Sequence, residues 1–189
     1  VTGGAVFIGS ITTLQLIEAG HQPVVLDNFS NSTPVALERV AELSGRKPAL
    51  VEGDVRDGAL LRRVLRDVGI EAVMHFAGLK AVGESVEKPL EYFDNNVQGS
   101  LSLLAAMRDE GVRTLVFSSS ATVYGMAETM PLREDAPTGT TNPYGRSKLM
   151  VEQILADLAA APGNTMSLCA LRYFNPVGAH PSGRMGEDP

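Results

Sequence analysis

The chain has 189 residues, of which 44% are hydrophobic and 20% are charged, as expected for one domain with a substantial core. Its formal net charge of -6 excludes a broadly basic nucleic-acid surface. No apolar run approaches the roughly 18 residues that a membrane span requires, and the lone Cys169 cannot form an internal disulfide. The three histidines have no ligand-like spacing, so no metal site is expected. We therefore expect a cytoplasmic protein that binds neither nucleic acid nor a membrane.

Short apolar runs alternate along the chain with longer segments of helical spacing. The expected strands lie at 24–26, 49–51, 72–74, 115–117 and 168–171. The expected helices cover 10–20, 33–44, 57–68, 92–110 and 144–161. Continuously apolar strands joined by helices predict a parallel sheet covered on both faces, which is the doubly wound α/β or Rossmann fold.

One domain is expected over residues 1–189, with functional loops at 28–33, 78–89 and 125–142. Both ends look incomplete. Only Val1 precedes the glycine-rich segment at 2–9, so most of the first strand is expected to be absent. Residues 181–189 read as an unfinished loop, which indicates a fragment of a longer protein.

The segment Thr2-Gly3-Gly4-Ala5-Val6-Phe7-Ile8-Gly9 has the spacing of a strand-to-helix turn that holds a dinucleotide pyrophosphate on backbone N–H groups. Gly3 would permit the tight turn, and Gly9 would let the helix pack closely. Val6 stands where a glycine is expected, and a positive φ there would store strain of order 1 to 3 kcal/mol. This motif alone is weak evidence for a dinucleotide site.

Asp27 supports the dinucleotide interpretation because it ends the second expected strand about 20 residues after the glycine turn. A carboxylate there accepts hydrogen bonds from the ribose hydroxyls and repels a 2′-phosphate, which favours NAD over NADP. The alternative is that Asp27 is an ordinary turn residue before Asn28.

Tyr144 and Lys148 are four residues apart, just inside a helix that Pro143 opens. An ammonium beside the phenol and the positive end of the helix would both lower the pKa of Tyr144 towards the range useful for a base. The alternative is an ordinary amphipathic helix, because this spacing is common.

Several longer blocks extend these motifs: TGGAVFIGS, LDNFSNS, EGDVRD, HFAGLKAVGES, DNNVQG, FSSSATVYG, PYGRSKLMVEQIL and RYFNPVGAHPSG. Together they resemble the extended short-chain dehydrogenase/reductases over essentially the whole chain, and in particular the branch that inverts carbon 4 of UDP-hexoses. Val6 and Ile11 depart from the family pattern, which has glycine and histidine there.

The resemblance implies a catalytic role for three residues. Tyr144 would remove the proton from the 4-hydroxyl of the sugar, and Lys148 would lower the phenol pKa and bind the nicotinamide ribose. Ser120 would share a hydrogen bond with the same hydroxyl, although a serine at a strand end is otherwise an ordinary loop cap.

The resemblance also implies an NAD site and a UDP-sugar site. The residues expected at NAD are Gly3, Phe7, Ile8, Gly9, Asp27, Asn28, Asn31, Ser32, Asp54, Val55, Phe76, Ala77, Gly78, Lys80, Asn95, Tyr144, Lys148 and Phe174. The residues expected at the sugar nucleotide are Ser120, Tyr144 and Asn175. Lys80 would offset the negative charge of both ligands, or it is simply a solvated loop lysine.

The implied reaction is a closed redox cycle in which hydride leaves carbon 4 of the sugar and returns to the opposite face. A 4,6-dehydratase is a weaker alternative, because Ala121-Thr122 follows Ser120 where an Asp-Glu pair is typical. A non-catalytic NAD sensor or scaffold is a second alternative. We further expect a homodimer through 92–110 and 144–161, a C-terminal substrate domain beyond the chain, and no activity from the 189 residues alone.

Overall fold

The computed structural model describes residues 1–127 and 130–187. Five short strands form its centre: β1 (Val24–Asp27), β2 (Ala49–Glu52), β3 (Ala72–His75), β4 (Thr114–Ser120) and β5 (Ser167–Tyr173). β1 pairs with β2, and β3, β4 and β5 pair in that order, all in parallel. Every expected strand and the parallel arrangement are confirmed.

Thr2 joins the two sets of strands, because it forms parallel bridges to Leu26 in β1 and to His75 in β3. The Gly3 N–H donates to the Leu26 carbonyl at 2.9 Å, and the Phe76 N–H donates to the Thr2 carbonyl at 2.9 Å. The first strand of the expected fold is therefore represented by this one bridging position, which sets the glycine turn between β1 and β3.

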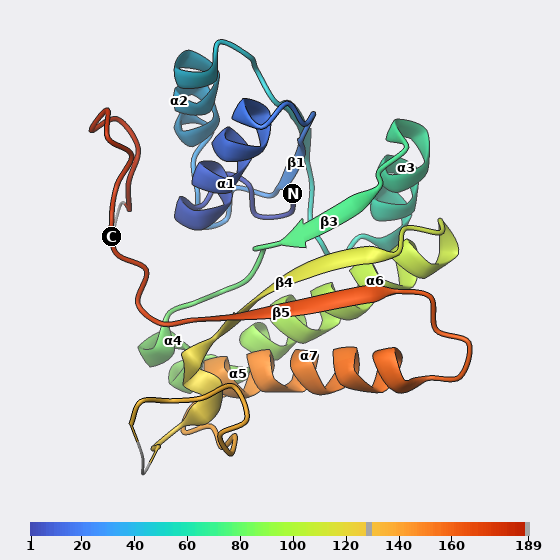
Figure 1. The fold of residues 1–189 in the computed structure, drawn as a ribbon, viewed down its shortest axis with the longest axis vertical. Helices are drawn as coiled ribbons and strands as arrows, with labels where there is room; N and C mark the ends of the chain where they lie inside the picture. Colours follow the sequence, from blue (N-terminus) through green and yellow to red (C-terminus); the bar gives the residue numbers. More distant parts are fainter. Residues whose placement is uncertain (128–129, 188–189) are drawn as a thin grey trace.

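Helices cover both faces of the strands (Figure 1). On one face, α1 (Phe7–Glu18) packs against α2 (Val35–Ser44), with Leu14 and Val40 buried between them. On the other face lie α3 (Gly58–Val68), α6 (Gly99–Asp109) and α7 (Pro143–Ala160), whose apolar side chains form the largest core cluster with β3 and β4. This two-sided cover confirms the doubly wound α/β fold.

The expected loop at 78–89 is in part wrong. It contains the helix α4 (Val82–Glu87) and the start of α5 (Pro89–Tyr92). The expected helix at 92–110 begins with a π-helical stretch, η1 (Phe93–Gln98), before α6, and a short 3-10 helix, η2 (Ala121–Tyr124), follows β4. The elements α4 and η2 follow β3 and β4, and Val82 of α4, Asn95 of η1 and Thr122 of η2 line the cavities described below.

The C-terminal segment after β5 runs back towards α1 and α2 (Figure 1). Met185 is buried against Leu14, Ile17 and Val40, and Arg184 forms an ion pair with Glu42. The described part of the predicted unfinished loop at 181–189 is therefore packed on the domain, whereas Asp188 and Pro189 lie outside the described residues. Within residues 1–127 and 130–187, no helix has the length and apolar character needed to span a bilayer.

Candidate active site

A cleft of about 690 Å³ opens where the strands end in their carboxyl direction. It contains most of the predicted site residues: Phe7, Ile8, Asn31, Ser32, Phe76, Gly78, Lys80, Ser120, Tyr144, Lys148, Phe174 and Asn175. A smaller cavity of about 30 Å³ adjoins it and contains Gly3, Asp27, Asn28, Asn31, Val55, Ala77, Gly78 and Asn95. Gly9 and Asp54 line neither space. Gly9 packs against Gly3, and Asp54 accepts a hydrogen bond from Asn28, so each contacts a residue that does line the small cavity.

The N-terminus of α7 carries two of the predicted catalytic side chains. The side chain of Asn142 caps the helix by accepting a hydrogen bond from the Gly145 N–H at 2.8 Å, and Pro143 occupies the first turn. Gly145 packs tightly on η2, because a Cβ there would lie only 3.1 Å from the Thr122 carbonyl oxygen. Asn142 and Pro143 thus fix where α7 begins, and Gly145 lets its first turn pack closely against η2.

Lys148 is 5% exposed and lies beneath the cleft. Its ammonium donates to the Ser118 carbonyl at 2.8 Å and sits 5.9 Å from the centroid of the Tyr144 ring and 4.9 Å from that of Phe117. Burial lowers the pKa of Lys148 to about 8, because the interior solvates the charged form poorly. At neutral pH the group is still mostly a cation.

The predicted lowering of the Tyr144 pKa is wrong for this geometry. Burial raises the pKa of the Tyr144 phenol above its ordinary value, and the Ser120 hydroxyl and the charge of Lys80 oppose that rise only in part. The sequence argument included the helix end and the cation but not the loss of solvent around the ring. Tyr144 is therefore a neutral phenol at neutral pH.

Ser120 ends β4 at the floor of the cleft and is 9% exposed. Its hydroxyl oxygen accepts from the Thr122 N–H at 3.2 Å and from the Thr122 hydroxyl at 2.9 Å. Because both bonds use the oxygen as acceptor, the Ser120 proton is left to donate towards the cleft. Sequence reasoning missed Thr122, although an ST-type turn after a strand end is a recognisable signal.

A half-buried ion pair supports the base of the cleft. Glu152 lies one turn beyond Lys148 on α7 and forms a two-pronged pair with Arg172 of β5, the shortest contact being 2.7 Å. Ser119, the neighbour of Ser120, also donates to Glu152. Arg172 in turn donates to the Tyr124 hydroxyl at 2.8 Å. This brace joins α7, β4, β5 and η2, and sequence reasoning missed it because its partners are far apart along the chain.

Asn96 in η1 ties the loop after β3 to α7. Its side chain accepts from the Leu79 N–H at 2.8 Å, donates to the Leu79 carbonyl at 3.0 Å, and donates to the Ser147 hydroxyl at 3.0 Å. Ser147 donates to the Tyr144 carbonyl at 2.7 Å. The predicted residue Asn95 donates to Asn96 at 2.9 Å. Asn96 therefore aligns the cleft wall at 78–79 with the first turn of α7.

The glycine turn has the geometry expected of Gly3 and Gly9. Gly3 adopts φ of +66°, and a Cβ there would lie 2.5 Å from the Ala77 nitrogen. A Cβ at Gly9 would lie 2.0 Å from the Gly3 carbonyl oxygen, so the close packing is onto the turn itself. The strain expected at Val6 is absent, because its φ of -81° and ψ of 169° are ordinary extended backbone. The predicted backbone strain at Val6 is therefore wrong.

Asp27 is buried at 5% exposure beside the glycine turn. One carboxylate oxygen accepts from the Ala5 N–H at 2.9 Å, and the other accepts from the Phe29 N–H at 3.0 Å and the Ser32 hydroxyl at 2.8 Å. A carboxylate offers about four acceptor positions, so one remains on the side of the small cavity. Asp27 both organises the loop at 28–33 and keeps an acceptor for a ligand.

The remaining predicted polar residues lie at the rims. Lys80 is exposed at the large cleft and pairs with Glu187 at 2.8 Å, so its charge is partly neutralised there. Phe174 is 63% exposed and, with Asn175, forms the outer wall. Across residues 1–127 and 130–187, no three His, Cys, Asp or Glu side chains cluster so as to hold a metal ion.

The model of the NAD dependent epimerase/dehydratase family matches residues 1–188 of the chain. The chain belongs to this family. A Bacillus subtilis protein named UDP-glucose 4-epimerase is 57% identical over 189 residues, and a human protein of the same name is 53% identical over 196 residues; each match covers 100% of this chain and 56% of the relative.

Solved structures of the family agree with the fold. A UDP-glucose-4-epimerase from Stenotrophomonas maltophila with bound NAD and formylated UDP-arabinopyranose superposes with a TM-score of 0.97 at 50% identity. The Bifidobacterium longum UDP-glucose 4-epimerase, in complex with NAD+ and UDP, gives a TM-score of 0.96 at 53% identity. Each comparison covers 100% of this chain and 56% of the solved one, so the chain spans about half the length of these family members.

Proposed function

We propose that this chain is the NAD-binding part of an enzyme that inverts carbon 4 of a UDP-hexose and interconverts UDP-glucose and UDP-galactose. A place in galactose metabolism follows from that substrate pair. The observation that carries the proposal is the convergence of Ser120, Tyr144 and Lys148 with the N-terminus of α1 in one cleft of about 690 Å³. The high identity to family members named for this reaction supports it.

The residues around the cleft fit NAD. No side chain in the described part of the chain caps the N-terminus of α1, and Phe7 and Ile8 begin that helix at the cleft. A helix N-terminus favours an anion such as a pyrophosphate. Asp27 has a free acceptor position for ribose hydroxyls. A Cβ at Gly78 would lie 3.3 Å from the Asn96 amide oxygen and 3.4 Å from the Lys148 ammonium, so the absence of a side chain at Gly78 keeps this wall of the cleft close to both groups.

The nicotinamide of NAD, when bound, would accept hydride from carbon 4 of the sugar and return it. Tyr144 would first lose its own proton to solvent, and the resulting phenolate would take the proton of the 4-hydroxyl as that hydride leaves and give it back on the return. Formation of the phenolate is costly at a buried position. The ammonium of Lys148, 5.9 Å from the ring centroid of Tyr144, would offset part of that cost. Ser120 would donate its proton to the same sugar oxygen and orient it.

Inversion requires the 4-keto sugar to turn over within the site before hydride returns. The exposed outer wall at Phe174 and Asn175, in a cleft of this volume, is consistent with such a movement. The lack of an acidic residue after Ser120, where Ala121 and Thr122 stand, disfavours the 4,6-dehydratase. The retention of Tyr144, Lys148 and Ser120 disfavours a sensor or scaffold without catalysis.

The test is conversion of UDP-galactose to UDP-glucose by the full-length protein that contains this chain, followed by proton NMR of the sugar. The proposal predicts an equilibrium mixture reached from either substrate, without net consumption of NAD. Release of water to give a 4-keto-6-deoxy sugar would instead identify a dehydratase. Binding of NAD with no change in either sugar would favour a sensor.

A further inference from the structure

The turn between β2 and α3 forms one wall of the small cavity that contains Asp27 and Asn28. Gly53 and Val55 of this turn face the cavity, and the Gly53 N–H donates to the Asp27 carbonyl at 3.0 Å. The turn packs closely on the helical segment opposite, because a Cβ at Gly99 would lie 2.6 Å from a methyl group of Val55. The wall is thus formed where the turn after β2 meets the end of β1 and the start of α6.

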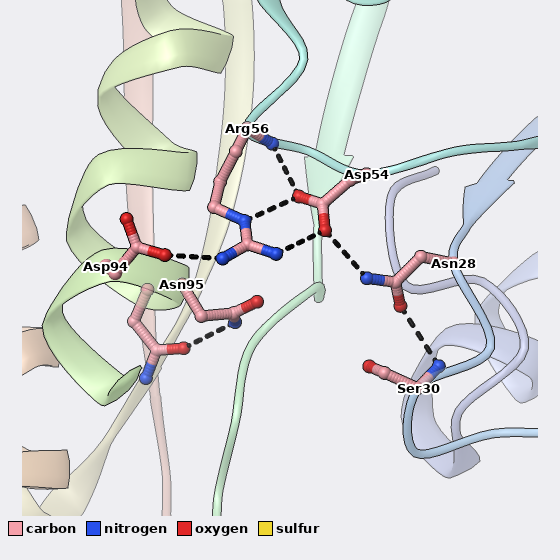
Figure 2. A network of polar contacts seen from close by, with 7 residues as sticks. Asn28, Ser30, Asp54, Arg56, Asp94 and Asn95 are labelled. Carbon is pink, nitrogen blue, oxygen red and sulfur yellow. Dashed lines mark hydrogen bonds and ion pairs between the residues drawn. The ribbon is translucent and has the colours of Figure 1, made fainter. Parts of the chain in front are cut away.

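Arg56 follows Val55 and spans these elements (Figure 2). Its Nε donates to one oxygen of Asp54 at 2.9 Å, and a terminal nitrogen donates to the other at 2.7 Å. The second terminal nitrogen pairs with Asp94 in η1. Asp94 precedes Asn95, which lines the same cavity. One guanidinium therefore links the turn after β2 to η1.

Asn28 completes the linkage from the third wall. Its side-chain amide donates to Asp54 at 3.0 Å, and its carbonyl accepts from the Ser30 N–H at 3.1 Å (Figure 2). Asp54 also accepts from the Arg56 N–H at 2.8 Å, so its about four acceptor positions are all engaged within the protein. The Asp54 carboxylate thus connects the loop of Asn28 to the turn of Arg56. Hydrogen bonds from Arg56 hold the pKa of Asp54 well below its ordinary value.

We propose that Arg56 is a positioning residue for the adenosine half of the cofactor site, because its fork holds Asp54 and Asp94 together and so fixes the distance between the walls that carry Val55, Asn28 and Asn95. This inference rests on the proposed function and takes the adenosine of NAD to lie against the residues that line the small cavity, which at about 30 Å³ holds only part of it. An isolated exposed ion pair contributes little, but a bidentate arginine in a network of several groups is more rigid.

The test compares ligands with and without adenosine on the full-length protein. Arg56→Gln should weaken ADP-ribose and NAD binding, measured by calorimetry, by about five- to ten-fold. Binding of UDP, which has no adenosine, should stay within about two-fold of the unmodified protein. Asp94→Asn removes one arm of the fork and should give a smaller loss in the same direction. Arg108→Gln is the matched control, because Arg108 pairs with Asp109 on α6, outside both cavities.

Arg56→Lys separates geometry from charge. Lysine keeps the positive charge but cannot bond two carboxylates as a planar fork. The ADP-ribose affinity of Arg56→Lys should therefore stay within about two-fold of that of Arg56→Gln. Two results would overturn the inference while leaving the proposed function intact. One is an ADP-ribose affinity in Arg56→Lys equal to that of the unmodified protein, and the other is an unchanged ADP-ribose affinity in Arg56→Gln. Equal losses for UDP and ADP-ribose would also overturn it, since they indicate general destabilisation. Failure of the unmodified protein to bind NAD would refute the proposed function and this inference together.

Discussion

Lys148→Met should make the protein more stable and inactive at once. The ordinary pKa of 10.5 falls to about 8 on burial, and that difference corresponds to about 3 kcal/mol of destabilisation at neutral pH. Methionine keeps an apolar stem in the same space but loses the bond to the Ser118 carbonyl, which offsets about 1 kcal/mol. We therefore expect about 2 kcal/mol of added stability, with turnover reduced by ~10²-fold or more.

The pH dependence of the free energy of unfolding tests whether the buried charge of Lys148 causes the destabilisation. The folded pKa of Lys148 lies below the unfolded value, so the native state binds fewer protons between about pH 8 and 10.5, and its stability rises with pH in that window. The stability gap between the methionine variant and the unmodified protein should therefore close over this range in urea unfolding. The exposed Lys47 is the control, and Lys47→Met should show neither effect. A Lys148→Met variant that is less stable at pH 7, with no closing gap, would refute the argument.

Three further predictions concern the cofactor turn and the helical surface. Asp27→Asn, which keeps an acceptor for the Ala5 N–H, should narrow the gap between NAD and NADP affinities in calorimetry; an unchanged ratio contradicts the ribose assignment. Val6→Gly should leave NAD affinity within about two-fold, because the valine backbone is unstrained, and a ten-fold tightening would show that its side chain obstructs the pyrophosphate. Leu101→Glu on α6, where Leu101 is 40% exposed, should convert the expected homodimer to a monomer in sedimentation, and an unaltered dimer would place the contact elsewhere.

The sequence predicted the strands, the long helices and the glycine turn because each depends on local pattern. Gly3 adopts the positive φ that a tight turn requires, and Asn142 with Pro143 marks the start of α7 as capping rules predict. The helix α4 was missed because a six-residue helix has too few turns to show a clear period. Its position follows from contacts with α5 and α7 rather than from its own pattern.

The site was predicted less completely because its electrostatics depend on burial and on distant partners. Tyr144 has a raised pKa since the folded chain excludes water from its ring, which no spacing of residues reveals. Arg172 and Glu152 are 20 residues apart and meet only because β5 pairs with β4 beneath α7. The prediction of strain at Val6 failed because the backbone of the turn was assumed rather than known.

Turnover of Tyr144→Phe in the full-length protein is the most direct test of the proposed mechanism. The substitution removes only the hydroxyl that would exchange a proton with the sugar. We predict that the rate of UDP-galactose conversion falls by ~10²-fold or more while NAD affinity stays within about two-fold, since the ring still lines the cleft. Turnover equal to that of the unmodified protein would remove Tyr144 from the chemistry and contradict the account.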